Sequence, residues 1–352
     1  MNAVLEALRR RGDTIALRGP GAQSLTGAQV LAAAARLAGE LRCRGTGRAA
    51  LVLDNGPSWV VADAACLMAG VTLVPLPTFF TRGQADHALA AAAVDTLLFD
   101  PARPPRDDLV VKTVIDGIAI AALDAPAGNA DGVARITFTS GTTGTPKGVC
   151  LSALQLERVA RSLADRVAGV GLERHLVVLP LAVLLENVAG VHAGLLAGAE
   201  IVFPDAGETG LSGSSAFDPV PLLTAIERLR PGSFILLPQM LKLVVRALRD
   251  SGRRLDGLHF IAVGGARTAP SLIHEARALG LPVYEGYGLS ECGSVVSLNT
   301  PDQDRPGSVG RVLPHVQICV SSENEILVLG PEPVRYAQDG AGGREWFATG
   351  DL

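Results

Sequence analysis

Residues Ser140 to Gly148 read Ser-Gly-Thr-Thr-Gly-Thr-Pro-Lys-Gly, and the rest of the chain is organised around this stretch. Its nine positions hold three glycines, four hydroxyl side chains and a single lysine. Glycine lets backbone amides approach an anion closely, hydroxyl groups donate hydrogen bonds, and the ammonium group supplies a positive charge. This composition predicts a loop that binds the phosphates of a nucleotide. A flexible surface turn is the alternative interpretation.

The run Val133 to Thr139, which precedes the loop, is apolar and β-branched. It predicts a strand, so the loop is expected to leave the end of a strand in an α/β sheet, where ligands tend to bind. The loop is not a Walker A motif, because Pro146 stands where that motif has glycine and Gly148 stands where it has Ser or Thr. A kinase or NTPase of another kind, which would release ADP, is a further alternative.

The composition indicates a globular protein with a small-molecule partner. The 352 residues are 48% hydrophobic, which allows two or three structural units with a real core. The 31 basic and 35 acidic residues form no block of like charge, so nothing favours nucleic acid or anionic lipid. The five cysteines form no CxxC pair. Together with the lack of a signal peptide and of a membrane span, this predicts a cytoplasmic, soluble protein.

The first two thirds of the chain alternate between helix and strand patterns, which predicts parallel strands joined by crossover helices. Thr26, for example, is expected to cap a helix that ends near Arg42, and Pro57 to begin one that ends at Gly70. We therefore predict two doubly wound α/β subdomains, residues 1–130 and 131–293, the second carrying the phosphate loop. From Ser294 onward, short strand patterns separated by turns predict a small, mainly β subdomain, residues 294–352.

A second constellation lies at Tyr284 to Glu291, which reads Tyr-Glu-Gly-Tyr-Gly-Leu-Ser-Glu. An aromatic ring between glycines can lie against a planar base, and a hydroxyl followed by a carboxylate can hold a phosphate oxygen and a divalent metal. Upstream, Gly264 and Gly265 follow a predicted strand and would let a ring approach the backbone. Each segment alone could equally be a glycine turn between a strand and a helix.

Three motifs in this order resemble the signatures of the adenylate-forming superfamily: SGTTGTPKG at Ser140 to Gly148, YGLSE at Tyr287 to Glu291, and TGDL at Thr349 to Leu352. This superfamily comprises the AMP-binding acyl-CoA and acyl-carrier ligases, adenylation domains and luciferases. Other similar segments extend the resemblance over nearly the whole chain: LTGAQVLAAAARLAGEL from Leu25, GVTLVPL from Gly70, GGA at Gly264 and NEILVLGP from Asn324.

The resemblance implies a large N-terminal domain of two α/β subdomains and a small β subdomain, with the active site in the crevice between them. It also implies that ATP, with Mg²⁺, and a carboxylic acid give an acyl adenylate and pyrophosphate. A thiol, of CoA or of the phosphopantetheine of a carrier protein, would then take the acyl group.

Carried onto this sequence, the resemblance makes Lys147, Ser290 and Glu291 the catalytic residues. Ser290 would contact the α phosphate, and Glu291 would be the Mg²⁺ ligand. Tyr287 would stack on adenine, and Asp351 would bind the ribose hydroxyls. The remaining nucleotide-binding residues would come from the phosphate loop and the glycine-rich segments: Ser140, Gly141, Thr142, Thr143, Gly144, Thr145, Gly148, Gly265, Ala266, Glu285, Gly286 and Gly288.

The chain departs from the family pattern after TGDL, where a hinge and a C-terminal lid domain that supplies a lysine normally follow. Nothing follows Leu352 here, and no lysine follows Lys242. We therefore expect the lid domain to be absent or to come from a separate chain, with the adenylation step impaired without it. A catalytically silent nucleotide-binding module and one half of a split enzyme are the alternatives.

The segment LPLAVLLEN, Leu179 to Asn187, resembles a stretch of long-chain fatty acyl ligases that often carries histidine where Val183 stands. No FDxS sequence of the amino-acid-activating type occupies this place. A fatty or aryl acid is therefore favoured, and an amino acid is the alternative. His192 is expected to be a core or surface residue rather than a catalyst, and Cys292 to be a small buried thiol that fills space rather than a nucleophile. The expected substrate-pocket residues are Val183, Leu184, Asn187, Gly264 and Gly288.

Overall fold

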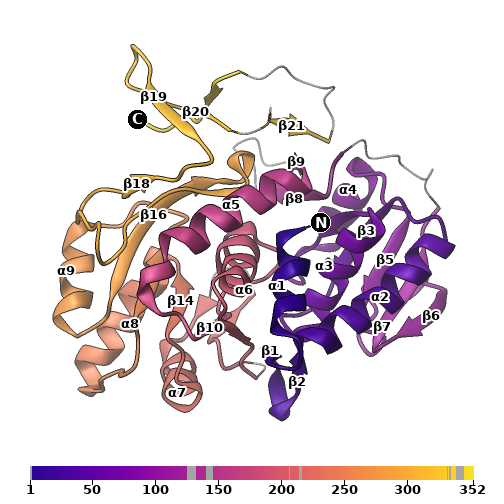
Figure 1. The fold of residues 1–352 in the computed structure, drawn as a ribbon, viewed down its shortest axis with the longest axis horizontal. Helices are drawn as coiled ribbons and strands as arrows, with labels where there is room; N and C mark the ends of the chain where they lie inside the picture. The colour runs from indigo at the N-terminus through magenta and orange to yellow at the C-terminus, as the bar shows by residue number, and fades with distance from the viewer. Residues whose placement is uncertain are drawn as a thin grey trace.

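The computed structural model describes residues 2–124, 132–139, 146–205, 207–213, 216–330, 332, 334–337 and 345–352. In these ranges the strands form two large sheets, here called sheet I and sheet II, a three-stranded sheet III, and the two-stranded ribbon β12(Leu211–Ser212) and β13(Ala216–Phe217). The two large sheets lie side by side, with sheet III above them and next to the C-terminus (Figure 1). The predicted α/β fold class is confirmed by similarity to solved structures described below.

Sheet I has, in spatial order, β18(Arg311–Val312), β17(Ser294–Leu298), β16(Val283–Leu289), β15(Phe260–Val263), β14(Ser233–Leu236), β10(Arg174–Leu176), β11(Glu200–Val202), β1(Ile15–Arg18) and β2(Ser24–Thr26). Sheet II has β21(Arg335–Tyr336), β9(Lys147–Leu151), β8(Arg135–Thr139), β4(Thr72–Pro75), β3(Arg48–Val52), β5(Thr96–Phe99), β7(Ile118–Ala122) and β6(Val111–Ile115). Sheet III has β19(Gln317–Val320), β20(Ile326–Leu329) and β22(Phe347–Ala348).

Helices flank both large sheets. Near sheet II lie α2(Gly27–Cys43), α3(Pro57–Ala69) and α4(Arg82–Ala91), and near sheet I lie α7(Pro219–Leu229), α8(Pro238–Ser251) and α9(Pro270–Ala278) (Figure 1). Between the sheets lie α1(Ala3–Arg11), α5(Ala153–Arg166), the π-helical segment η3(Leu185–His192) and α6(Ala193–Leu196). The short 3₁₀ turns are η1(Pro20–Ala22), η2(Ala168–Val170) and η4(Ser290–Cys292). No helix of the described residues is long and apolar enough to cross a membrane.

Local sequence signals place the element ends. Thr26 forms the expected cap of α2, and its side chain and that of Gln29 make a reciprocal capping box. Pro57 is the first residue of α3, and Gly70 ends that helix in the left-handed conformation, with φ of 71°. In sheet II, β3 pairs in parallel with both β4 and β5, as the alternating pattern predicts. The edge hairpin of β6 and β7 was not predicted.

The sheets are not built from contiguous stretches of chain. Strands β1 and β2, from the first predicted subdomain, lie in sheet I, whereas β8 and β9, which follow residue 131, lie in sheet II. Strands β17 and β18, from the predicted β subdomain, extend sheet I. The subdomain boundaries at residues 130 and 293 stay predictions. The order of strands along the sequence does not show that strands before and after these boundaries pair in the same sheet.

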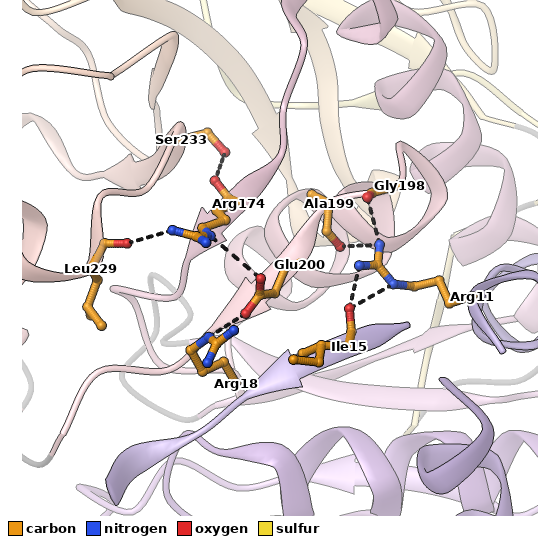
Figure 2. Close-up of polar contacts among 9 residues, drawn as sticks. All are labelled: Arg11, Ile15, Arg18, Arg174, Gly198, Ala199, Glu200, Leu229 and Ser233. Carbon is orange, nitrogen blue, oxygen red and sulfur yellow. Dashed lines mark hydrogen bonds and ion pairs between the residues drawn. The ribbon is translucent and has the colours of Figure 1, made fainter. Parts of the chain in front are cut away.

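Charged side chains connect β1 with its neighbour β11 in sheet I. Figure 2 shows Glu200 between two arginines, with 2.5 Å from its Oε1 to Nε of Arg18 and 3.5 Å from its Oε2 to Nε of Arg174. Nearby, Arg11 donates from Nη1 to the carbonyl of Gly198 at 2.6 Å and from Nη2 to that of Ile15 at 2.5 Å. The Arg18–Glu200 and Arg11–Gly198 contacts tie the N-terminal segment to β11 and to the residues before it.

One apolar core continues from sheet II into the layer between the sheets. It joins side chains of α2 and α3 to Val191 of η3 and Leu195 of α6. At its centre Asp63 of α3 pairs with Arg135 of β8, and its Oδ2 lies 2.7 Å from Nε2 of His192. All three side chains are buried. These contacts join the helical layer to β8, the strand before the predicted phosphate loop, and His192 is a core residue, the first of the two roles expected for it.

Candidate functional site

The predicted phosphate loop, residues 140–148, follows β8, and its last two residues begin β9. Residues 140–145, which include the predicted binding residues Ser140, Gly141, Thr142, Thr143, Gly144 and Thr145, lie outside the described residues. Pro146 is buried, and its carbonyl oxygen lies 3.2 Å from Nε2 of His87 on α4. A Cβ on Gly148 would lie 2.9 Å from Cγ2 of Ile136, so the start of β9 has room for glycine only.

Lys147 and Glu291 both contact the side chain of Tyr336. The Nζ atom of Lys147 lies 5.8 Å from the ring centroid of Tyr336, within the range of a cation–π contact. The hydroxyl of Tyr336 donates to Oε1 of Glu291 at 3.3 Å. Tyr336 reaches this place because β21 pairs with β9, which starts at Lys147. The predicted cation and the predicted metal ligand therefore both contact Tyr336, Lys147 over its ring and Glu291 at its hydroxyl group.

Sequence reasoning did not single out Tyr336. It lies in a two-residue strand, outside every recognised motif, and pairs with a strand that lies about 190 positions earlier. Nothing in its local pattern signals that pairing, because short antiparallel edge strands carry almost no periodicity.

Tyr287 and Asp351 are also brought together. The hydroxyl of Tyr287 donates to Oδ2 of Asp351 at 2.5 Å, and the backbone of Gly350 is held by the Glu325 carboxylate at 2.7 Å. Burial, followed by the hydrogen bond to Asp351, raises the pKa of Tyr287 above its usual value. The phenol is therefore a hydrogen-bond donor at neutral pH. Two motifs that are 64 positions apart form one surface.

The glycines around Tyr287 are required by the close approach of β17. A Cβ on Gly288 would lie 1.8 Å from the carbonyl oxygen of Ser294, and one on Gly286 would lie 3.2 Å from that of Ser297. Gly265 has φ of 81°, a conformation that favours glycine. The backbone of β16 on both sides of Tyr287 therefore lies too close to β17 for larger residues than glycine.

Ser290 and Glu291 begin η4 at the end of β16, and both are partly exposed. Cys292 is buried, and burial raises the pKa of its thiol to about 12. It fills the core, as expected, and is not a thiolate at neutral pH. Among the described residues, no group of three or more His, Cys, Asp or Glu side chains could hold a metal ion.

A cavity of about 350 Å³ opens beside these motifs. Its lining includes Gly264 and the exposed or partly exposed residues Gly265, Tyr287, Gly288 and Ser290, and these five residues are here called its outer end. Its walls are mostly apolar and come from α5, η3 and the strands of sheet I, including Leu163, Val167, Leu184, Ile235 and Phe260. The volume is that of a small-ligand site.

Four of the five expected substrate-pocket residues line this cavity: Val183, Leu184, Gly264 and Gly288. Asn187 does not, although it is buried in the same helical segment. Leu185 of η3, the pair Ala189 and Gly190, and the pair Ala193 and Gly194 of α6 line the cavity, the groups recurring four to five positions apart, and Asn187 falls between them. The segment from Leu185 to His192 winds as a π-helix, which has more residues per turn than an α-helix and so spaces the lining residues more widely.

Two further predicted nucleotide-binding residues lie away from the cavity lining. Ala266 is exposed in the turn after β15. Glu285 is buried, its Oε1 accepts the backbone N–H of Thr268 at 3.3 Å, and burial raises its pKa. Its carboxyl group supports that turn.

A family model described as AMP-binding enzyme matches residues 4–334. The 2-succinylbenzoate–CoA ligase of Bacillus subtilis (strain 168) is 26% identical over 356 residues, which cover 94% of this chain and 70% of the relative. The structure of o-succinylbenzoate CoA synthetase from Bacillus subtilis is similar in two complexes. The complex with ATP and magnesium ion matches with a TM-score of 0.76 and 24% identity, and the match covers 99% of this chain and 76% of that chain. The complex with its acyl-adenylate intermediate matches with a TM-score of 0.78 and 24% identity, and the match covers 99% of this chain and 74% of that chain.

Proposed function

Because the chain belongs to the AMP-binding enzyme family, we propose that it activates an apolar carboxylic acid by adenylation, using ATP and releasing pyrophosphate. The predicted enzyme class, an AMP-forming ligase, is confirmed by this membership. The identity of the acid and the acyl acceptor belong to the proposal.

One observation carries the proposal. The apolar cavity is lined at its outer end by Tyr287, Gly288 and Ser290, residues of the same motif that supplies Glu291. A carboxylic acid whose body occupies the cavity would present its carboxylate at the residues that bind the nucleotide. Adenylation requires this juxtaposition, because the carboxylate oxygen must reach the α phosphorus in line with the leaving pyrophosphate.

The polar residues at the outer end have the charges this reaction needs. Attack by a carboxylate on a phosphate brings two anions together, so positive charge and aimed donors must offset them. Lys147 supplies a cation at the end of the phosphate loop, and Ser290 supplies a hydroxyl donor. Asp351, held by Tyr287, offers a carboxylate that can accept from the two ribose hydroxyls.

Glu291 fits a magnesium ion bound together with phosphates. Mg²⁺ takes one or two protein carboxylates and completes its shell with phosphate oxygens and water. Glu291 is a partly exposed carboxylate next to the phosphate loop, with one oxygen near the Tyr336 hydroxyl. When bound there, Mg²⁺ would supply charge neutralisation of the phosphates.

The cavity favours an aryl or fatty acid. Its walls are mainly Leu, Val, Ile and Phe side chains, and Val183, 39% exposed, lines it where a polar residue often stands in long-chain ligases. The Bacillus subtilis relative is a ligase of 2-succinylbenzoate, an aryl acid. By the same analogy, a thiol of CoA or of a carrier protein would be the acyl acceptor, and a C-terminal domain would assist from outside the described fold.

Hydroxamate trapping tests the proposal. The protein is incubated with ATP, Mg²⁺, hydroxylamine and a panel of aryl, fatty and amino acids, and the nucleotide product is identified. We expect acid-dependent hydroxamate and AMP, a weaker response in Lys147→Ala, and none in Glu291→Ala. Formation of ADP would point to a kinase. Tight ATP binding with no acid-dependent product would point to a silent nucleotide-binding module.

A further inference from the structure

The cavity has a polar inner end. Ser233 and His175, both buried, line it among apolar neighbours. Ser233 is the first residue of β14 and pairs with Phe260, whereas Leu236, three residues later, pairs with Val263, just before Gly264. Three residues of a strand span roughly 10 Å. The polar pair therefore lies that far along the cavity from its nucleotide end.

A buried network fixes His175. The Oε2 atom of Glu186 accepts the backbone N–H groups of Val178 at 3.2 Å and Leu179 at 2.8 Å. Its Oε1 lies 2.9 Å from Nε2 of His175, whose Nδ1 lies 3.0 Å from Oγ of Ser233. With two amide donors already on the carboxyl group, Nε2–H of His175 is the third donor to it. Glu186 therefore orients the imidazole, and the imidazole orients Ser233.

The hydroxyl group of Ser233 has two possible hydrogen-bonding arrangements, which depend on whether Nδ1 of His175 carries a proton. If Nδ1 carries no proton, Ser233 donates to it. If Nδ1 is protonated, it donates to Oγ, and Ser233 turns its proton to the carbonyl of Arg174, 3.5 Å away (Figure 2). Because Nε2–H is donated to Glu186, a neutral imidazole has no proton on Nδ1, so Ser233 donates its own proton to Nδ1 and Oγ keeps its lone pairs. The inner end of the cavity therefore presents a hydrogen-bond acceptor.

We infer that Ser233 selects carboxylic acids that carry a hydrogen-bond donor, a hydroxyl or an amino group, at the end remote from the carboxylate. This inference rests on the proposed function and narrows its substrate class to donor-tipped apolar acids, such as para-hydroxyaryl acids. A methyl or methoxy group in the same place leaves the Ser233 lone pair unpaired in an apolar enclosure. Sites built to bind a hydroxyl group reject analogues that lack it for this reason.

The test compares stable sulfamoyl analogues of the acyl adenylate whose aryl tails differ only in the para substituent: hydroxyl, methyl or methoxy. Phenylacetyl and phenylpropanoyl linkers are both used, so that one tail length matches the cavity. Affinities are measured by isothermal titration calorimetry on the wild-type protein, and ATP binding is measured alongside. We expect the hydroxyl analogue of the better-fitting linker to bind about tenfold more tightly than its two counterparts.

Two variants locate the effect. Ser233→Ala is expected to bring the ratio of affinities to about one, while Ser162→Ala, a buried serine of α5 that does not line the cavity, keeps the wild-type ratio. Thermal unfolding of both variants reports their stability. Equal binding of the three analogues by the wild-type protein overturns the inference but not the proposed function. If the wild-type protein binds neither ATP nor any analogue, both the inference and the proposed function are overturned. The comparison of the three analogues on the wild-type protein tests the inference even if Ser233→Ala does not fold.

Discussion

The hydroxyl of Tyr287 donates a hydrogen bond to the carboxylate of Asp351, with 2.5 Å between Oη and Oδ2. Tyr287 ends up there because glycines on both sides let β16 pass close to β17, and Asp351 because β22 pairs with β20 in sheet III. The bond engages Oδ2 of Asp351 and holds its carboxylate beside Tyr287, which lines the cavity.

Substitutions at this pair are expected to separate ring stacking from ribose binding. Asp351→Asn should weaken the binding of a non-hydrolysable ATP analogue about tenfold, since a hydrogen bond to a charged group contributes ~1.5–3 kcal/mol. Tyr287→Phe keeps the ring and should cost less than Tyr287→Leu, which removes it. Calorimetric titration measures the three affinities. Equal losses in Tyr287→Phe and Tyr287→Leu would contradict a stacking role.

Glu291→Gln is expected to change the response to magnesium. The amide keeps the shape of the side chain but loses the charge that a hard cation requires. The concentration of Mg²⁺ that gives half-maximal adenylation should rise at least tenfold, while ATP affinity measured without metal should stay near that of the wild-type protein. Tyr336→Phe, which removes only the hydroxyl near Oε1 of Glu291, serves as the control and should have a much smaller effect. An unchanged magnesium profile in Glu291→Gln would remove this residue from the metal site.

Asp63 is expected to make stability depend on pH. Burial opposes its ionisation, but the charges and hydrogen bonds of Arg135 and His192 outweigh burial and hold its pKa well below the usual range. A carboxyl group whose pKa is lowered by folding stabilises the fold above its unfolded pKa of about 3.9, and this contribution is lost as the pH falls further. The free energy of unfolding should therefore drop from pH 4 toward pH 2.

Asp63→Asn should flatten that dependence and, at pH 7, lower the free energy of unfolding by about 3–5 kcal/mol, because it leaves the buried charge of Arg135 unpaired. Denaturant unfolding at several pH values measures both effects. Asp116→Asn, which breaks the exposed pair with Arg36, is the matched control and should change little. A wild-type pH profile in Asp63→Asn would show that another group titrates.

A side chain at Gly190 is expected to destabilise the protein. A Cβ there would lie 2.2 Å from Oε1 of Glu186 and 2.6 Å from Nε2 of His175. Gly190→Ala should lower the free energy of unfolding by ~1–3 kcal/mol through overpacking. In α2, by contrast, a Cβ on Gly39 meets nothing within 4 Å, and Gly39→Ala should stabilise the protein by up to ~1 kcal/mol. Thermal melts of the two variants should shift in opposite directions, and a stabilised Gly190→Ala would contradict the tight packing around the His175 pair.

Sequence patterns predict those parts of the fold that local chemistry dictates. The cap at Thr26 and the left-handed glycine at Gly70 appear where they are expected, because a cap is a contact within a few residues. Long-range strand pairing leaves no such local mark. The placement of β1 in sheet I and of Tyr336 beside Lys147 could not be predicted for that reason.

The candidate site was predicted only where its residues lie in motifs. Tyr287, Glu291 and Asp351 were found by resemblance, but His175 and Ser233 are single polar residues directly before apolar runs, outside every motif, so nothing in the sequence marks them as site residues. Their contact depends on the register between β10 and β14, in which His175 pairs with Ser233. Asn187 was expected to line the pocket as part of the segment Leu179 to Asn187, and it is buried without lining the cavity.

Acid-dependent exchange between ATP and labelled pyrophosphate tests adenylation most directly, because only a reversible attack of a carboxylate on the α phosphorus returns the label to ATP. The assay is run with aryl, fatty and amino acids, with and without a C-terminal domain of an adenylate-forming relative added as a separate chain. We predict exchange that requires an apolar acid and disappears in Glu291→Ala. A protein that binds ATP but shows no acid-dependent exchange in either condition, or that forms ADP, would contradict the account.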